Sequence, residues 1–141
     1  MNGDAGMKGR KGRDRGFTLI EMIIVFTLIG ILVGLGLPQY QTAAKRAREA
    51  VLKEDLFQFR KLIDQYVQDK GKYPASLQTL VEEKYLRSIP IDPLTKSSTT
   101  WVDVRETPAP DEYTPAENLG IVDVRSGSDA KALDGTLFNT W

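Results

Sequence analysis

Few residues in this chain could perform catalytic chemistry. The 141 residues include no cysteine and no histidine, which excludes a Cys/His zinc site, a Cys–His dyad and a Ser-His-Asp triad. The lack of cysteine also excludes a disulfide framework. Carboxylates such as Glu82 and Glu83 stand in mixed polar sequence, without a nucleophile and base arranged around them. We therefore predict that the protein is not an enzyme.

One ionisable residue nevertheless has an unusual position. Glu21 is the only charged residue in the apolar run 17–37. A carboxylate inside such a run costs a few kcal/mol in a membrane unless it finds a partner, and ionisable residues in that setting usually have a function. Glu21 is therefore the first candidate functional residue, and its chemistry is that of an acid that needs a cation.

The run around Glu21 has the length of a membrane span. As an α-helix, at about 1.5 Å per residue, residues 17–37 would extend roughly 30 Å, the thickness of the hydrocarbon core of a bilayer. The core of a secretory signal peptide is shorter and is followed by a small-residue cleavage site. A simple membrane anchor would explain the length but not Glu21. A buried core helix is disfavoured because the run is apolar on every face.

Charge is distributed unevenly along the chain. Lys+Arg and Asp+Glu both total 19, but the first 16 residues hold five bases and two acids. The remainder therefore has 14 bases and 17 acids, a net charge of −3. Bases ahead of the apolar run place the N-terminus in the cytoplasm and the rest of the chain across the membrane. The mildly acidic remainder gives no support to a nucleic-acid partner.

The start of the apolar run resembles the processing motif of type IV pilins and type II secretion pseudopilins. That motif is carried here by Gly16-Phe17-Thr-Leu-Ile-Glu21, with the basic leader before it and Pro38 after it. The resemblance implies that a prepilin peptidase cuts between Gly16 and Phe17 and methylates the new Phe17 amine. It divides the chain into a leader (1–16), a transmembrane and assembly segment (17–38) and a periplasmic domain (39–141).

The same resemblance implies a filament of many copies. The Phe17 amine of one copy would meet the Glu21 carboxylate of a neighbour and neutralise both charges in a low-dielectric setting. Gly30 and Gly34 form a G-x-x-x-G pattern that allows close helix contact. Together with Pro38, which breaks or kinks the helix in many relatives, they predict a stretch at 30–38 that partly melts on assembly.

Beyond Pro38 the sequence predicts an α+β domain. Residues 39–70 contain no Gly or Pro and carry an apolar stripe at helical spacing, and Gly71 ends that helix. A short helix is expected from about Ser76 to Lys84. Strands are expected at 99–106 and 119–125, with an exposed loop between them, and a third near 136–138. The long N-terminal spine helix would thus have a membrane-spanning first half and a second half packed on a small antiparallel sheet, as in type IV pilins. Trp141 is expected to cap the core.

The apolar stripe of the predicted helix 39–70 consists of Leu52, Leu56, Phe59, Ile63 and Tyr66.

The segment G-x-Y-P-x-S-L…I-P-x-D-P at 71–93 and the final loop are similar to those of the major pseudopilin of type II secretion systems. This resemblance implies a structural subunit of the bacterial inner membrane that helps to move proteins across the outer membrane. Its partners would be minor pseudopilins and a membrane assembly platform driven by a cytoplasmic ATPase. Two alternatives stay open: a type IV pilin of a surface or DNA-uptake pilus, and a monomeric membrane-anchored binding domain.

The C-terminal loop 126–141 resembles the calcium-binding loop of major pseudopilins. Asp129 and Asp134 are its only carboxylates, and Asp123, Ser126 and Ser128 could add oxygens towards the six to eight that calcium requires. The adjacent acidic pair usual in that loop is missing here. An Asx-turn loop without an ion is the other interpretation.

Overall fold

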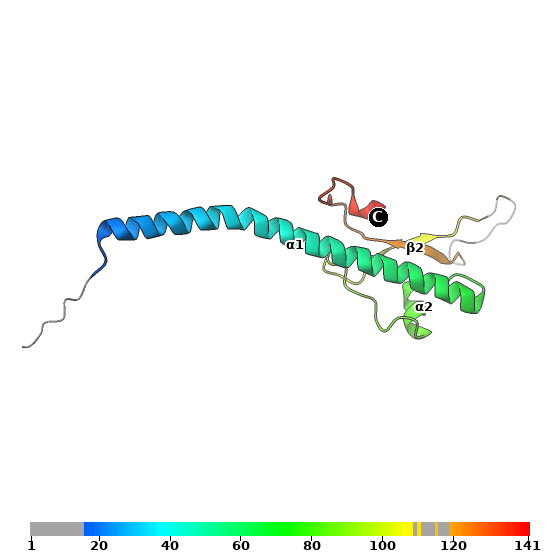
Figure 1. Ribbon diagram of the computed structural model, residues 1–141. Coiled ribbons are helices and arrows are strands. Elements are labelled where there is room, and N and C mark those ends of the chain that lie inside the picture. Colours follow the sequence, from blue (N-terminus) through cyan, green and yellow to red (C-terminus); the bar gives the residue numbers. More distant parts are fainter. Residues whose placement is uncertain (1–15, 109, 111–114, 116–118) are drawn as a thin grey trace, which may run out of the picture. The chain divides into compact units, whose positions relative to one another are not determined.

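The computed structural model describes residues 16–108, 110, 115 and 119–141. Residues 1–15, which belong to the predicted leader, and most of the loop expected at 107–118 lie outside the described residues. In chain order the elements are helix α1 (Leu19–Lys70), helix α2 (Leu77–Glu82), strand β1 (Val102–Arg105), strand β2 (Ile121–Arg125) and a 3₁₀ helix, η2 (Phe138–Thr140) (Figure 1). This is the α+β arrangement that the sequence predicted.

Helix α1 runs without interruption from Leu19 to Lys70, although Pro38 lies inside it. Proline removes the hydrogen bond to the carbonyl four residues earlier and its ring crowds that carbonyl; here the earlier residue is Gly34. Pro38 therefore does not break the helix in this structure. Melting of 30–38 on assembly stays a prediction. The chain divides into two compact units within α1, residues 1–40 and 41–141.

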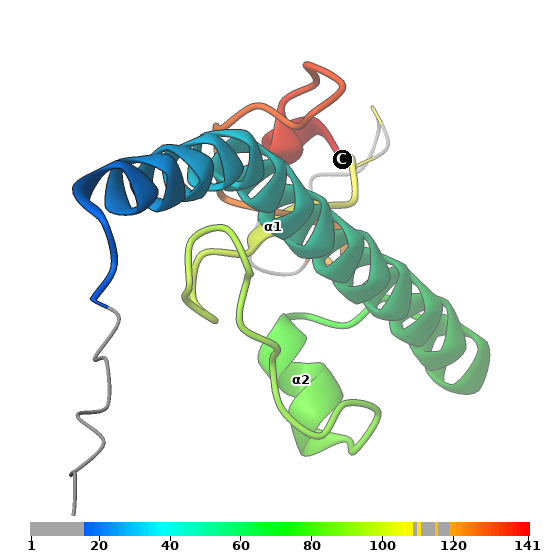
Figure 2. The same ribbon diagram turned by 60° about the vertical axis from the view of Figure 1, so that its left-hand side comes forward.

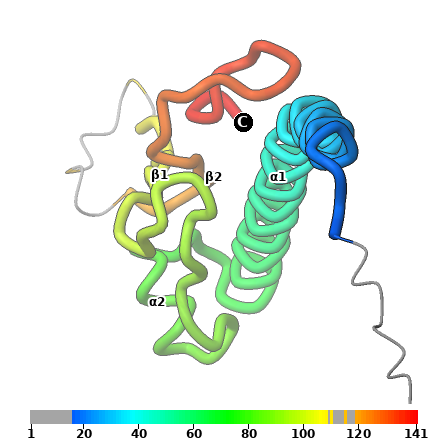
Figure 3. Tube along the Cα trace, turned by 90° about the vertical axis from the view of Figure 1, so that its left-hand side faces the viewer, coloured from blue at the N-terminus to red at the C-terminus, as the bar shows by residue number. Residues whose placement is uncertain are grey.

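The core of the second unit is built on the predicted apolar stripe. Its five residues are at most 4% exposed, and burial of each such side chain contributes about 1.5–3 kcal/mol. They meet Leu80 of α2, Trp101, and Ile121 and Val124 of β2. Figure 3 shows the second half of α1 on one side of this core, with α2 and the strands on the other.

Local signals set the ends of the helices. Gly71 follows α1 with a φ of +70°, a left-handed conformation that glycine adopts without a Cβ penalty. Ser76 caps α2, and its side-chain oxygen accepts the Thr79 amide at 3.2 Å. The loop after α2 then packs on the core through Tyr85, Leu86, Ile89 and Leu94, beside the second half of α1 (Figure 2).

The sheet has two antiparallel strands among the described residues. Its two Val-Asp-Val-Arg sequences, 102–105 and 122–125, pair with each other, with Val102 opposite Arg125 and Val104 opposite Asp123. The pairing shifts between Val104 and Arg105, a bulge that leaves Ile121 fully buried.

The third strand expected at 136–138 was wrong. Leu137 forms only an isolated bridge with Lys131, and the chain turns into η2 at Phe138. The physical reason is the tight turn at Asp134-Gly135, where Gly135 has a φ of +87°. It folds the segment onto itself, so its amides bond within 130–138 instead of extending the sheet. Trp141 does cap the core, as expected, and packs edge-on against Phe138 at 4.9 Å.

Candidate functional site

The predicted cleavage junction lies just ahead of helix α1. Residues 16–18 are exposed and not helical, and no other atom would lie within 4 Å of a Cβ added at Gly16. The peptide bond between Gly16 and Phe17 is therefore open to a protease. An exposed, non-helical backbone can enter a protease site, so the local structure is compatible with the predicted processing.

Thr18 positions Glu21 at the start of α1. The Thr18 side-chain oxygen accepts the Glu21 amide at 3.3 Å, and the Thr18 carbonyl accepts the Met22 amide at 3.1 Å. This is half of a capping box, in which Ser or Thr caps a helix and Glu stands three residues later. The sequence reasoning missed this role, although the Thr-x-x-Glu spacing was a readable signal for it.

The Glu21 carboxylate has no partner among the residues that the structure describes. Glu21 is exposed, and no described residue forms an ion pair or side-chain hydrogen bond with its carboxylate. Its neighbours Phe17, Leu19 and Ile20 are 76%, 80% and 67% exposed. Helix α1 is long and apolar enough to cross a membrane, and none of its apolar window is buried in the protein. Both the Glu21 carboxylate and the apolar surface around it are therefore available for contact with another molecule.

Gly30 and Gly34 lie one turn apart on this apolar segment. Nothing approaches within 4 Å of a Cβ added at either residue. The two glycines therefore leave a flat, uncovered strip on the helix, the surface that small-residue motifs offer to a second helix. Neither of them, nor Pro38, is brought to the junction at Gly16 by the fold; they share only the helix.

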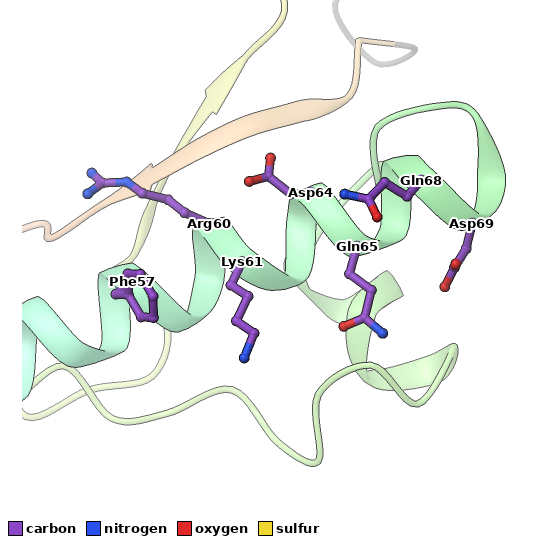
Figure 4. Close-up of a pocket in the computed structure, with 7 residues that line it drawn as sticks. All are labelled: Phe57, Arg60, Lys61, Asp64, Gln65, Gln68 and Asp69. Carbon is purple, nitrogen blue, oxygen red and sulfur yellow. The ribbon is translucent and has the colours of Figure 1, made fainter.

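A groove of about 750 Å³ runs along the second half of α1 (Figure 4). Figure 4 shows Lys61 and Gln65 on one side of the helix and Arg60 and Asp64 on the other. Phe57, at its end, is 59% exposed. The groove is lined by bases, acids and amides that all belong to one helix, so it offers a contact surface.

Arg60 links this helix to the C-terminal part of the domain. Its Nε donates to Asp123 Oδ1 at 2.8 Å, and its Nη2 donates to the Trp141 carbonyl at 2.6 Å. Lys53 lies over the Trp141 ring, 4.7 Å from the ring centre. Charge-assisted contacts therefore hold β2 and Trp141 against α1.

A buried polar pair holds the loop after α2 against β2. Asp92 and Ser126 are both 0% exposed, and the Ser126 hydroxyl donates to Asp92 Oδ2 at 2.5 Å. The other oxygen, Oδ1, accepts the amides of Leu94 at 2.8 Å and Thr95 at 3.4 Å. The sequence analysis did not identify this contact.

Several of the oxygens named for calcium have protein partners in this structure. Asp134 Oδ1 accepts both the amide and the hydroxyl of Thr136, at 2.9 and 2.6 Å. Asp123 is paired with Arg60 and Ser126 with Asp92, which leaves the exposed Asp129 as a lone carboxylate. In the described part of the chain no three acidic side chains gather where a metal ion could sit. The geometry is that of the Asx-turn, and calcium binding remains an untested expectation.

The Asp134 turn should make the stability of the domain depend on pH. Hydrogen bonds from the Thr136 hydroxyl and amide lower the pKa of Asp134. A lowered pKa in the folded state means that the stabilisation is complete above the ordinary carboxyl value, about pH 4, and is lost as pH falls through the folded-state pKa. We expect Asp134→Ala to lower the thermal midpoint at neutral pH, by less and less as the pH falls below 4.

Asp55 supplies the matched control for that experiment. Burial raises the pKa of Asp55, with smaller contributions from the charges of Asp92 and Glu54. The sign is therefore opposite: the charged form is a cost to the fold above about pH 4. Asp55→Asn should leave the midpoint at neutral pH unchanged or higher. Equal losses for both variants in a pH series of thermal melts would contradict these assignments.

Comparison with known protein families gives a match at the N-terminal segment that holds the Gly16–Phe17 junction and Glu21. Residues 11–37 match the family described as the prokaryotic N-terminal methylation motif. The matched stretch contains the Gly16–Phe17 junction, Glu21 and both glycines of the G-x-x-x-G pattern, and it ends one residue before Pro38.

Relatives cover the rest of the chain. The type II secretion system core protein G of Pseudomonas aeruginosa is 28% identical over 148 aligned residues, which cover 92% of this chain and 99% of that protein. The core protein G of Klebsiella pneumoniae is 31% identical over 97 residues, 57% of this chain and 69% of that protein. This chain belongs to the type II secretion system core protein G family, the major pseudopilins.

A pilus protein is also similar. The fimbrial protein EcpC of Eikenella corrodens is 34% identical over 80 residues, 53% of this chain and 52% of that protein. No solved structure matches the chain. Members of the family have a pilin or pseudopilin role, and the apolar N-terminal helix is a single-pass anchor of the inner membrane.

Proposed function

We propose that this chain is the major structural subunit of a type II secretion pseudopilus, a periplasmic filament that helps to move proteins across the outer membrane. The observation that carries the proposal is the Glu21 carboxylate, which has no partner among the described residues and lies in the first turn of an exposed apolar helix, directly after an accessible Gly-Phe junction. Family membership supports it, since relatives over most of the chain are named as secretion system proteins.

Processing would create the partner that Glu21 lacks. Cleavage between Gly16 and Phe17 gives Phe17 a cationic α-amine, four residues before Glu21. In a filament of staggered helices, the amine of one copy and the carboxylate of another neutralise each other where water is excluded. The pair would also fix the axial register between copies. The uncovered strip at Gly30 and Gly34 would let neighbouring helices approach closely.

The proposal includes an orientation and a set of partners. The five bases of the leader place the N-terminus in the cytoplasm and residues 39–141 in the periplasm. A prepilin peptidase would cut and methylate the chain, and minor pseudopilins and an inner-membrane assembly platform would act with it. The groove of Figure 4, with exposed Phe57, is a surface available to adjacent copies.

Mass spectrometry of the N-terminus of the membrane-bound protein tests the processing step. We expect residues 1–16 to be absent and Phe17 to carry one methyl group. Gly16→Val should leave the leader attached, because a branched side chain at the cleavage position obstructs the peptidase, whereas Gly9→Val within the leader should be cut normally. A working protein that retains Met1 through Gly16 would refute the processing and the assembly role together.

A surface or DNA-uptake pilus is the second candidate, because the fimbrial protein EcpC is 34% identical to this chain over 80 residues. Deleting the chromosomal copy of this chain separates the two functions. Loss of enzymes from the culture medium with normal surface filaments supports secretion. Loss of surface filaments or of DNA uptake with normal secretion supports the pilus.

A further inference from the structure

The apolar stripe of α1 becomes basic towards its membrane-proximal end. Its members follow one another at spacings of four and three, from Tyr66 back to Leu52. Further steps of four, three and four residues from Leu52 towards the N-terminus reach Arg48, Lys45 and Gln41, with Glu49 next to Arg48. Residues at such spacings share one face of a helix. The face of α1 that packs on the core therefore continues, at its N-terminal end, into two cationic side chains and an amide. An apolar core cannot bury these groups without partners.

These residues line a cavity of about 370 Å³. Gln41, Lys45 and Arg48 form the α1 side, and Ser128 and Lys131 come from the C-terminal segment. Leu94 and Phe138 supply an apolar wall. The lining thus has three cations and no carboxylate. At about 30 Å³ per water molecule, the space would hold roughly a dozen waters. This is enough for a phosphate group and part of the organic group esterified to it.

The three cations lack acidic partners within the described residues. The ion pairs there join Arg60 to Asp123, Lys70 to Glu83 and Arg105 to Asp103. Glu49, the acid next to Arg48, has its Oε1 occupied by the Leu133 amide at 2.7 Å. Like charges that share a cavity repel one another, so an anion placed between them would be stabilised.

The cavity is held in shape before any ligand arrives. Lys131 lies in a hairpin closed by Ala132 N–H to Thr136 O, at 2.8 Å, and by Phe138 N–H to Ala130 O, at 3.1 Å. The Ser128 side-chain oxygen accepts the Ala130 amide at 3.3 Å, so its hydroxyl hydrogen remains able to donate. A guanidinium, two ammonium groups and a hydroxyl donor match the several acceptor oxygens of a phosphate.

The short sequence distance between the cavity residues and the apolar run favours a membrane lipid as the source of the phosphate. Lys45 and Arg48 follow Pro38, at the end of the apolar run, by only seven and ten residues. The polar headgroup layer begins where the hydrocarbon core ends, and long basic side chains reach towards it along their apolar stems. We propose that Lys45, Arg48 and Lys131 form a binding site for the phosphate group of an anionic phospholipid. The inference rests on membrane anchoring and does not require filament assembly.

A photo-crosslinking experiment locates the lipid. The full chain is placed in nanodiscs of phosphatidylcholine containing a minor fraction of phosphatidylglycerol, with a photoreactive amino acid at Gln41. Mass spectrometry then measures the crosslinked lipid. Each base near an anionic surface is worth about 1 kcal/mol, or roughly fivefold in affinity. The triple variant K45Q/R48Q/K131Q should therefore lose at least tenfold in phosphatidylglycerol crosslinking.

The control variant K61Q/K72Q/R87Q removes the same number of lysine and arginine charges at exposed positions outside the cavity. It should crosslink as the unmodified chain does. Equal losses in the two triple variants would show diffuse surface attraction and overturn the proposal. Displacement of the lipid signal by millimolar inorganic phosphate would overturn the lipid as the source. Crosslinks from Gln41 to a second copy of the chain, in place of lipid, would reassign the cavity to protein contacts.

Discussion

Substitution of Glu21 by glutamine is expected to abolish filament assembly while leaving the amount of chain in the membrane unchanged or higher. Glutamine keeps the shape of the side chain but removes the charge that would pair with the Phe17 amine of another copy. A lone carboxylate costs a few kcal/mol in the apolar layer, so its removal favours the free membrane form. In a filament, the same change would leave the Phe17 amine of the neighbouring copy without a counter-ion. The measurement is the yield of sheared filaments compared with the membrane-bound pool.

Glu82→Gln is the matched control, because Glu82 is an exposed acid on α2 outside the apolar helix. It should assemble normally. Normal assembly of the Glu21→Gln variant would instead favour the monomeric membrane-anchored binding domain, in which the apolar helix is an anchor alone.

Substitution of Asp92 by alanine is expected to be the most destabilising polar change in the domain. Both carboxylate oxygens accept hydrogen bonds at a site that is 0% exposed. Truncation would leave the buried Ser126 hydroxyl and the partly buried Leu94 amide without their partner. Each unsatisfied buried group costs about 1–3 kcal/mol, so the free energy of unfolding should fall by roughly 3–5 kcal/mol.

Urea denaturation of the full chain in detergent, followed by tryptophan fluorescence, measures this change, since Trp101 lies in the same core as β2. Ser126→Ala removes only the partner at Oδ2 and should cost about 1–2 kcal/mol. Asp92→Asn retains an acceptor for the two amides and should fall between these variants. An Asp92→Ala variant as stable as the unmodified chain would show that the loop at 90–100 is held by other contacts.

The sequence by itself determined the features that depend on neighbouring residues. The apolar run around Glu21, the stripe from Leu52 to Tyr66 and the Gly71 helix end follow from periodicity and backbone preference, which act within one or two turns. The cleavage junction at Gly16 was inferred from the same kind of local pattern and stays a prediction. The Thr18 cap belongs to this group too, because its Thr-x-x-Glu signal is local.

Only the tertiary structure decided the contacts between residues far apart in the chain. Asp92 and Ser126 are 34 positions apart, and Arg60 and Asp123 are 63 apart; no local pattern marks either pair. The third predicted strand failed because β-propensity near Leu137 could not show that a tight turn would fold the segment onto itself. The fold places Lys131 in the same cavity as Lys45 and Arg48, and no sequence pattern predicted this cluster of cations. Local preference specifies elements, whereas burial and charge pairing between elements specify sites.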